Sequence, residues 1–481
     1  MLRVLLFFWG ILIVLSFPFR WLLKGWDQVS VLLSIFAITV FFPPDMFLAQ
    51  IIVVIAAFII SLIYLYFKKI HYRSHHITYS LNAASSIFIL LIVFGFLKQA
   101  SVLSPADIPQ LTWKSKPAPF MPTMPDDFPD IYYIVLDGYG RSDILSDYYG
   151  YDNSEFLDYL SSEGFILPTK ARSNYSRTVL SVSSTLNMEY ISDLTPGLTN
   201  KDTYYWWLMR PLLVDSQVGR ILKDIGYRSY STTSGWGPTD NLATNIYYQP
   251  APIILSDLEG VVLATTPLQV FYPFLREYAY IPSYTSHRDL ILKNLEILPA
   301  ASKDLGPKFF FAHLIAPHPP FVFDEKGTPT TPDHPYSFND GNDLGLDAED
   351  YRNGYIAQLK FINTKLKEAI SEILKNSQTP PIIILQADHG PGMYMDFTSP
   401  ENTCLRERYS IFAAYHLPGI QENAIPDDIT PVNLFRIIFN EYFGADYPLL
   451  PNSHYFTENI RLFHNQDLTP QVDTCSIFED S

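Results

Sequence analysis

The stretch 381–390 reads PIIILQADHG and joins a strand-forming segment to side chains that a buried strand end does not need. Its apolar residues form one continuous run, as expected for a strand that is covered on both faces of a parallel sheet. The run leads into Asp388, His389 and Gly390. A carboxylate and an imidazole side by side are typical ligands of zinc or manganese. The stretch therefore predicts a metal site at the end of a buried strand.

Two other predicted strands carry the same kinds of residue near their ends. IYYIVLD, 131–137, ends in Asp137, and KFFFAHLIA, 308–316, contains His313 and is followed by His318. Ligands of open parallel sheets bind outside the carboxyl ends of the strands. Taken singly, each residue has an ordinary explanation, since an Asp after a strand often caps the next helix and a His between prolines is commonly a loop residue. Their joint occurrence at successive strand ends favours the metal site.

Strands and helices alternate beyond residue 130. YRSYSTT, 227–233, and SIFAAYHLP, 410–418, read as further strands, whereas 153–165 and 354–376 have apolar residues at helical spacing. Alternation of this kind, with continuous apolar strands, is typical of a mostly parallel sheet with helices on both faces. The sequence thus predicts an α/β fold for the globular part of the chain.

The first hundred residues have a different composition, because long apolar runs dominate them. A membrane span needs about 20 apolar residues, and we expect about four spans within 1–100. The first run has a signal peptide as its alternative, but the next apolar runs follow at once. The four runs are 4–19, 26–42, 46–67 and 77–97.

The distribution of positive charge predicts how these spans are oriented. The loop 68–76, KKIHYRSHH, is the most basic and is expected in the cytoplasm, on the same side as Arg20 and Lys24. Four spans then place the rest of the chain outside the cytoplasm. Residues 101–130 are rich in proline and read as an extended linker. We therefore expect a multi-pass protein of the cell membrane with an extracytoplasmic catalytic domain over 131–481.

Charge and cysteine content fit this division. The whole chain has a net charge of −16, of which residues 1–100 contribute +5, so the outer part carries −21. Nucleic-acid binding needs a basic surface, so a nucleic-acid partner is excluded. Cys404 and Cys475 both lie in the outer part, where an oxidising compartment permits a disulfide. The sequence leaves open whether they pair or remain two thiols.

A nucleophile is expected in the segment 173–190, SNYSRTVLSVSSTLNMEY, which is dense in hydroxyl groups and reads as a loop that runs into a helix. A helix N-terminus suits a phosphate or sulfate oxyanion. A metal ion lowers the pKa of a coordinated hydroxyl and makes it a nucleophile. The alternative is an ordinary helix capped by Ser or Thr. The hydroxyl groups that compete are Thr178, Ser181, Ser183 and Ser184.

These features together resemble the alkaline phosphatase superfamily. More closely, they resemble the membrane-anchored sulfatase-like proteins, which include phosphoethanolamine transferases and lipoteichoic acid synthases. The resemblance rests on the LDG strand end at 136–138, a hydroxyl nucleophile some forty residues later and ADHG at 387–390. It covers most of 130–420. It implies several N-terminal transmembrane helices followed by an alkaline-phosphatase-like α/β/α domain.

The resemblance also implies one divalent metal ion, zinc or manganese. Its ligands would be Asp137, Thr178, Asp388 and His389, although the nearer relatives have Glu where this chain has Asp137. A second set of Asp and His ligands is not evident, which favours a single ion.

The same resemblance implies a catalytic and a substrate-binding set. TVLS, 178–181, matches a Thr-x-x-Ser pattern at a helix start, which makes Thr178 the nucleophile and Ser181 the fallback. His318, in a PHPPF context, matches a histidine that contacts the substrate phosphate and is expected to be catalytic. Asn174, His313 and Ser181 are expected to join it in binding substrate.

The implied reaction is the transfer of a phosphoethanolamine- or phosphoglycerol-like group from a lipid donor to an envelope acceptor. True sulfatases convert Cys or Ser in C/S-x-P-x-R to formylglycine, and TVLSV, 178–182, has neither the proline nor the arginine. Sulfate-ester hydrolysis is thereby disfavoured. Two alternatives stay open: a sulfatase or phosphodiesterase that acts on surface glycans or lipids, and a non-catalytic envelope protein that keeps the fold.

Overall fold

The structure is a computed structural model that describes residues 16–17, 20–21, 128–196 and 206–475, except 241, 243, 252, 256–262, 264–271, 276–277, 335 and 459–460. Nearly all of the predicted spans and linker lie outside the described residues. Among the helices that are described, none combines the length and the apolar character that a bilayer crossing requires. The described residues belong to two compact units, one with 16–17, 20–21 and those within 251–282, and the other with those within 128–250 and 283–475.

The larger unit is built around a six-stranded sheet in the order β3-β2-β6-β1-β7-β8. Its strands are β1 (Ile131–Leu136), β2 (Arg228–Thr232), β3 (Ile246–Tyr248), β6 (Lys308–Leu314), β7 (Ile382–Gln386) and β8 (Ala413–His416). All neighbours are parallel except β7 and β8. The central strands β6, β1 and β7 are buried along their whole length. These apolar runs confirm the predicted mostly parallel sheet.

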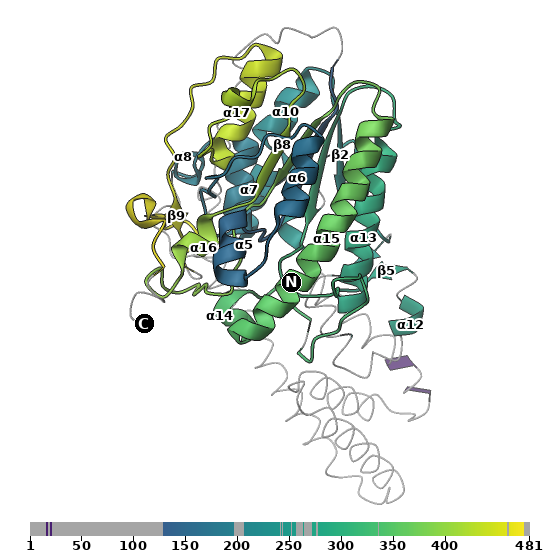
Figure 1. Cartoon of the computed structure of the whole chain (residues 1–481). Coiled ribbons are helices and arrows are strands. Elements are labelled where there is room, and N and C mark those ends of the chain that lie inside the picture. The colour runs from purple at the N-terminus through teal and green to yellow at the C-terminus, as the bar shows by residue number, and fades with distance from the viewer. Residues whose placement is uncertain are drawn as a thin grey trace, which may run out of the picture. The chain divides into compact units, whose positions relative to one another are not determined.

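Helices cover both faces of the sheet, as Figure 1 shows. One group is α6 (Ser154–Ser162), α13 (Tyr284–Ala301) and α15 (Ala348–Asn376), and the other is α7 (Thr178–Asn187), α10 (Gln217–Asp224) and α17 (Pro431–Phe443). Tyr133 of β1 packs edge-on against Phe435 of α17 at 5.4 Å. The adjacent Tyr132 points to the opposite face, where it stacks on Phe310. The helices expected within 153–165 and 354–376 are α6 and α15.

Shorter elements complete the larger unit. They are the helices α5 (Ser142–Tyr149), α8 (Ile191–Leu194), α9 (Arg210–Val214), α14 (Gly341–Leu344) and α16 (Leu405–Tyr409), the strand pair β9 (Tyr455–Phe456) and β10 (Gln466–Asp467), and the 3-10 turns η4 (Trp206–Met209), η5 (Gly237–Thr239), η7 (Glu422–Ala424) and η8 (Thr469–Gln471). The other unit contains β4 (Ile253–Ile254), β5 (Ala279–Tyr280) and α12 (Tyr272–Leu275), in which β4 and β5 pair in parallel.

The two cysteines form a disulfide between Cys404 and Cys475. Cys404 immediately precedes α16, so the bond joins that helix to the C-terminal end of the described chain. Backbone contacts support the same junction, because Arg406 N donates to Thr474 O at 3.0 Å. The pairing that the sequence left open is therefore present in the structure.

Candidate metal centre

The register of the central strands brings two predicted ligands to one level. Val135 of β1 is aligned with His313 of β6 on one side and with Gln386 of β7 on the other. Asp137 lies two residues after Val135, and Asp388 lies two residues after Gln386, so both leave the sheet at its carboxyl edge. This is the edge at which parallel sheets bind ligands.

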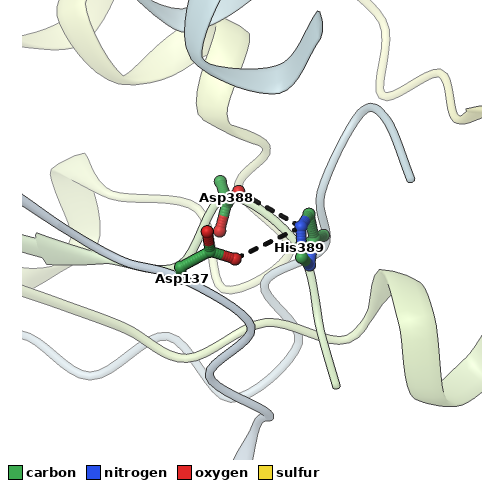
Figure 2. A group of neighbouring side chains, drawn as sticks. All are labelled: Asp137, Asp388 and His389. Atoms are coloured by element: carbon green, nitrogen blue, oxygen red, sulfur yellow. Dashed lines mark ion pairs between the residues drawn. The ribbon is translucent and has the colours of Figure 1, made fainter. Parts of the chain in front are cut away.

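Asp137, Asp388 and His389 form one buried cluster, which Figure 2 shows. His389 Nε2 lies 3.4 Å from Asp137 Oδ1 and 3.3 Å from Asp388 Oδ2. One ligand atom from each residue lies within 4.8 Å of the others. Within the described parts of the chain it is the one group of three or more His, Cys, Asp or Glu side chains with this spacing.

The unsatisfied atoms of the cluster fit a cation. Asp137 Oδ1 and Asp388 Oδ2 are buried, and neither accepts a hydrogen bond. A buried carboxylate oxygen without a partner is costly, and buried charges are normally paired or coordinate a metal. Burial alone would raise the pKa of Asp137, but the charge of His318 and the hydrogen bond from His313 outweigh it and hold that pKa below its usual value. The donor set therefore suits a divalent ion.

The hydrogen bonds of His389 leave the correct nitrogen available. Nδ1 lies 2.9 Å from the carbonyl oxygen of Gly390. Because a carbonyl can only accept, Nδ1 must carry the proton, and the lone pair of the neutral ring is on Nε2. Burial lowers the pKa of His389, and the Arg408 charge lowers it further, which favours this neutral ring. Gly390 permits the chain at Glu407 to pass close by, because a Cβ at this position would lie 2.1 Å from Glu407 O.

Thr178 joins the cluster from α7. Its Oγ1 lies 3.0 Å from His389 Nε2, the same atom that the two carboxylates face. α7 begins at Thr178, preceded by Arg177 in extended conformation, so the helix start predicted from the sequence is confirmed. Thr178 and Val179 both line the adjoining cavity. The free N–H groups of a helix's first turn suit an oxyanion there.

The other residues predicted to bind substrate occupy three different environments. Ser181 is buried one turn deeper in α7, with its Oγ 3.4 Å from Ser173 Oγ. Asn174 links its loop to two other segments, because its side chain donates to Ser453 O and accepts from Val432 N. Neither residue is among those that line the cavity. Both positions therefore favour structural support over direct substrate contact.

The two histidines in and after β6, His313 and His318, lie in different environments. His313 lies behind Asp137, with Nε2 3.2 Å from Asp137 Oδ2 and Nδ1 2.8 Å from Thr239 Oγ1. It is not among the residues that line the cavity, so its position favours orienting Asp137. His318 does line the cavity, and its Nδ1 faces the carbonyl of Pro319. Burial would lower the pKa of His318, but Asp137 and Asp340 outweigh it and raise that pKa.

The cavity beside the cluster has a volume of about 510 Å³. Sequence reasoning missed much of its lining, in particular Arg177, Arg408 and Asp340. Arg177 directly precedes the predicted nucleophile, which is a signal that could have been used. Arg408 lies in RERY, 406–409, whose charges read as an exposed surface run. Apolar walls are supplied by Val179, Trp236, Ile315, Phe338, Phe397 and Leu462.

A stripe of polar side chains on α15 holds the loops around the site. Tyr355 Oη accepts from Gly140 N at 3.0 Å and donates to Gly138 O at 2.9 Å, which fixes the loop after β1. Tyr351 Oη donates to Asp340 Oδ1 at 2.7 Å. Gln358 accepts from Val322 N at 2.8 Å and donates to His318 O at 3.0 Å. One rigid helix therefore positions the segments that carry Asp137, His318 and Asp340.

Gln358→Ala is expected to lower the free energy of unfolding by about 1–3 kcal/mol, because the buried Val322 N–H would lose its acceptor. Denaturant titration of the full chain in detergent, followed by tryptophan fluorescence, measures the change. Thr364→Ala, on the exposed side of the same helix, is the matched control and should have little effect. Equal stabilities of the two variants would show that Gln358 does not hold the 317–322 loop.

The structure thus brings together a carboxylate after the first strand, a helix-terminal hydroxyl and an Asp-His pair at the carboxyl edge of a mostly parallel sheet. A model of the family described as sulfatase matches residues 129–470. The chain belongs to the sulfatase family, and it is a sulfatase-like enzyme. No curated protein sequence matches the chain significantly.

Several solved structures are similar in fold. The C-terminal periplasmic domain of EcEptC from Escherichia coli, in complex with Zn, is 12% identical and matches over 73% of this chain and 96% of that one, with a TM-score of 0.47. The corresponding domain of phosphoethanolamine transferase EptC from Campylobacter jejuni is 13% identical over 65% and 89%, with a TM-score of 0.39. A protein of the alkaline phosphatase superfamily from Vibrio parahaemolyticus is 14% identical over 74% and 82%, with a TM-score of 0.42.

Proposed function

We propose that this enzyme transfers a phosphoryl-type group, such as phosphoethanolamine or phosphoglycerol, from a lipid donor to an envelope acceptor through Thr178. One observation carries the proposal. Thr178 Oγ1 lies 3.0 Å from His389 Nε2, at the point where the unsatisfied oxygens of Asp137 and Asp388 converge. A hydroxyl in that place, at a helix N-terminus and open to a cavity, is positioned to attack a substrate.

Four side chains would hold one divalent ion, namely Asp137, Thr178, Asp388 and His389. Carboxylate, hydroxyl and imidazole donors favour zinc or manganese. Bound there, the ion supplies Lewis acidity, which lowers the pKa of the Thr178 hydroxyl and offsets negative charge on the substrate.

The remaining chemistry belongs to the chain itself. The deprotonated hydroxyl of Thr178 forms a bond to phosphorus while the bond from phosphorus to the lipid oxygen breaks. His318, with Nδ1 engaged by the Pro319 carbonyl, donates the proton on Nε2 to the departing oxygen. In the second step the acceptor hydroxyl gives its proton to His318 Nε2 and attacks phosphorus, which frees Thr178. If water takes the acceptor's place, the same residues perform hydrolysis.

A sulfatase reaction is less well supported. Formylglycine is an aldehyde made from Cys or Ser, and the β-methyl group of Thr178 prevents an aldehyde from forming at that position. The proline and arginine of the formylglycine motif are also absent from 178–182. A phosphorus-containing group is therefore the better substrate class for this site.

The proposed location is the outer surface of the membrane. The disulfide between Cys404 and Cys475 supports an oxidising compartment, in agreement with the orientation expected from the basic loop 68–76. A multi-pass anchor within 1–100 would keep the domain beside its lipid donor. The acceptor would be a lipid or glycan of the same surface.

The test is to trap the intermediate. Full-length protein in detergent is mixed with acyl-labelled phosphatidylethanolamine or phosphatidylglycerol, quenched rapidly and mapped by peptide mass spectrometry. We expect labelled diacylglycerol together with an adduct on Thr178, whose mass identifies the group carried. Release of diacylglycerol without any adduct on Thr178 would contradict covalent transfer and favour direct hydrolysis.

A further inference from the structure

We propose that the segment 251–282 is a second membrane contact of this chain, which lies on the outer surface of the bilayer and places the rings of Phe274 and Tyr278 among the lipid headgroups. The segment leaves the larger unit after β3 and returns to it at α13. The inference rests on the proposed location outside the cytoplasm. It goes beyond that location, because it assigns a membrane contact to a segment far from the predicted spans.

The amino-acid sequence of this segment suits a membrane surface. Residues 260–275, GVVLATTPLQVFYPFL, contain no charged side chain and are followed directly by Arg276 and Glu277. The stretch is shorter than the about 20 apolar residues that a membrane span needs. Pro267 and Pro273 interrupt it as well, and proline breaks a helix. A short apolar stretch of this kind is typical either of a protein interior or of a segment at the membrane surface.

The described residues of the segment have a small interior of their own. Leu263, Ala279 and Ile281 are buried in one apolar cluster, and Leu255 and Leu275 pack against it. The parallel pair of β4 and β5 belongs to the same region of the chain. These residues are therefore folded, so an apolar side chain that stays outside the cluster is exposed by the fold itself.

Two aromatic side chains stay outside this cluster. Phe274 directly precedes Leu275 in α12, and yet 66% of its surface is exposed. Tyr278 is exposed to 53%, and its backbone N–H donates to Leu275 O at 3.0 Å, which fixes its place after the helix. The centres of the two rings lie 5.8 Å apart. Phe274 and Tyr278 thus form one exposed aromatic pair.

Among the side chains that the structure describes, exposed aromatic rings occur in only one of the two units. The other two are Phe17 and Trp21, which belong to the same unit as 251–282. They lie at the end of the first predicted span, where aromatic rings are typical of the boundary between lipid and water. The large exposed apolar side chains described in the larger unit are Leu305 and Leu449, which are aliphatic. Exposed rings in the described chain therefore accompany a predicted membrane boundary, and the aromatic pair is the one exception.

A bilayer surface is the partner that these features favour. A tyrosine has an apolar ring and a polar hydroxyl, and such side chains are favoured at the level of the lipid headgroups. There Phe274 would leave water, while the hydroxyl of Tyr278 would stay in contact with it. The lipid donor proposed for Thr178 also requires the larger unit to remain at that surface. A segment that lies on the bilayer, in addition to the predicted anchor within 1–100, would keep it there.

A fluorescent label at one position of the full chain tests the inference. The two cysteines of the chain form the disulfide, so a cysteine introduced elsewhere is the single free thiol. Phe274→Cys is labelled with a polarity-sensitive fluorophore and reconstituted into vesicles made of equal parts of phosphatidylethanolamine and phosphatidylglycerol. Leu305→Cys is the matched control, because Leu305 is 74% exposed and belongs to the larger unit. We expect a nitroxide on the lipid headgroup to quench the label at 274 several-fold more than the label at 305, and iodide on both sides of the membrane to do the reverse.

Two other results would overturn the inference. Quenching of the label at 274 by iodide alone would show that the aromatic pair remains in water. Protection from both quenchers would show that protein covers it, either a second copy of this chain or another partner. Tyr278→Cys, labelled in the same way, takes the place of Phe274→Cys if that variant does not fold. The label reports lipid contact without turnover, so a wild type that forms no Thr178 adduct would contradict the proposed function alone.

Discussion

Thr178→Ala is expected to reduce turnover of labelled phosphatidylethanolamine on the order of a thousandfold or more, because it removes the attacking oxygen. The thermal midpoint of the metal-free protein should hardly change. Thr178 Oγ1 makes its contact with His389 Nε2 at 3.0 Å, and Arg408 Nη2 lies beside the same nitrogen at 3.2 Å. The ring would thus keep a donor after the substitution.

Ser181→Ala is the matched control for this experiment. Ser181 lies in the same helix, but its side chain is buried against Ser173. It lies one turn beyond the N-terminal edge of α7 and is not among the residues that line the cavity. Its loss should cost much less activity. A dead Ser181→Ala beside an active Thr178→Ala would assign the nucleophile to Ser181.

The sheet was predictable because its central strands are apolar without interruption. β1, β6 and β7 are buried on both faces, and such strands need no polar alternation. The same reasoning could not show that β8 runs antiparallel to β7, since the direction of a strand depends on how its connection packs. Nor could it establish the register that brings Asp137 level with Asp388.

The role expected for His313 illustrates a weakness of motif reasoning. The sequence places His313 and His318 together because one lies within the apolar run 308–316 and the other shortly after it. His313, however, lies inside β6, and its side chain reaches Asp137 Oδ2 and Thr239 rather than the cavity. A residue within a strand faces one surface of the sheet, whereas a residue beyond the strand end can turn toward the ligand. The position of each histidine relative to the end of β6 therefore explains why His318 lines the cavity and His313 does not.

Arg408 could not be found from its local sequence. RERY, 406–409, has the composition of an exposed segment, and a buried arginine is rare unless it is paired. Its pairing depends on Asp340, which lies 68 positions away in the chain. Only the fold brings that carboxylate, the Ser176 carbonyl and the Gly390 carbonyl around one guanidinium. Hydrogen bonds between a buried arginine and acceptors far away in the sequence leave no periodic pattern that could be recognised.

Asp388→Asn and His389→Ala are both expected to abolish metal binding by the full chain, which in the wild type should hold about one zinc or manganese ion. Each variant removes a donor from a cluster whose ligand atoms lie within 4.8 Å of one another. The fold should survive, because β7 beneath the cluster is buried through its apolar side chains. Metal content by mass spectrometry, before and after dialysis against the ion, measures the effect.

The metal-free proteins provide a second, independent readout. Asp388 Oδ2 is buried without a hydrogen bond, so its charge costs stability when no cation is bound. In Asp388→Asn the oxygen that faces Gly138 N at 3.3 Å can remain in place, and the charge is gone. Its thermal midpoint without metal should therefore equal or exceed that of the wild type, while added zinc should raise only the wild-type midpoint. Full metal occupancy in both variants would show that the ion binds elsewhere. If metal-free Asp388→Asn were less stable than the metal-free wild type, the charge of Asp388 would be stabilised by the protein itself rather than by a bound cation.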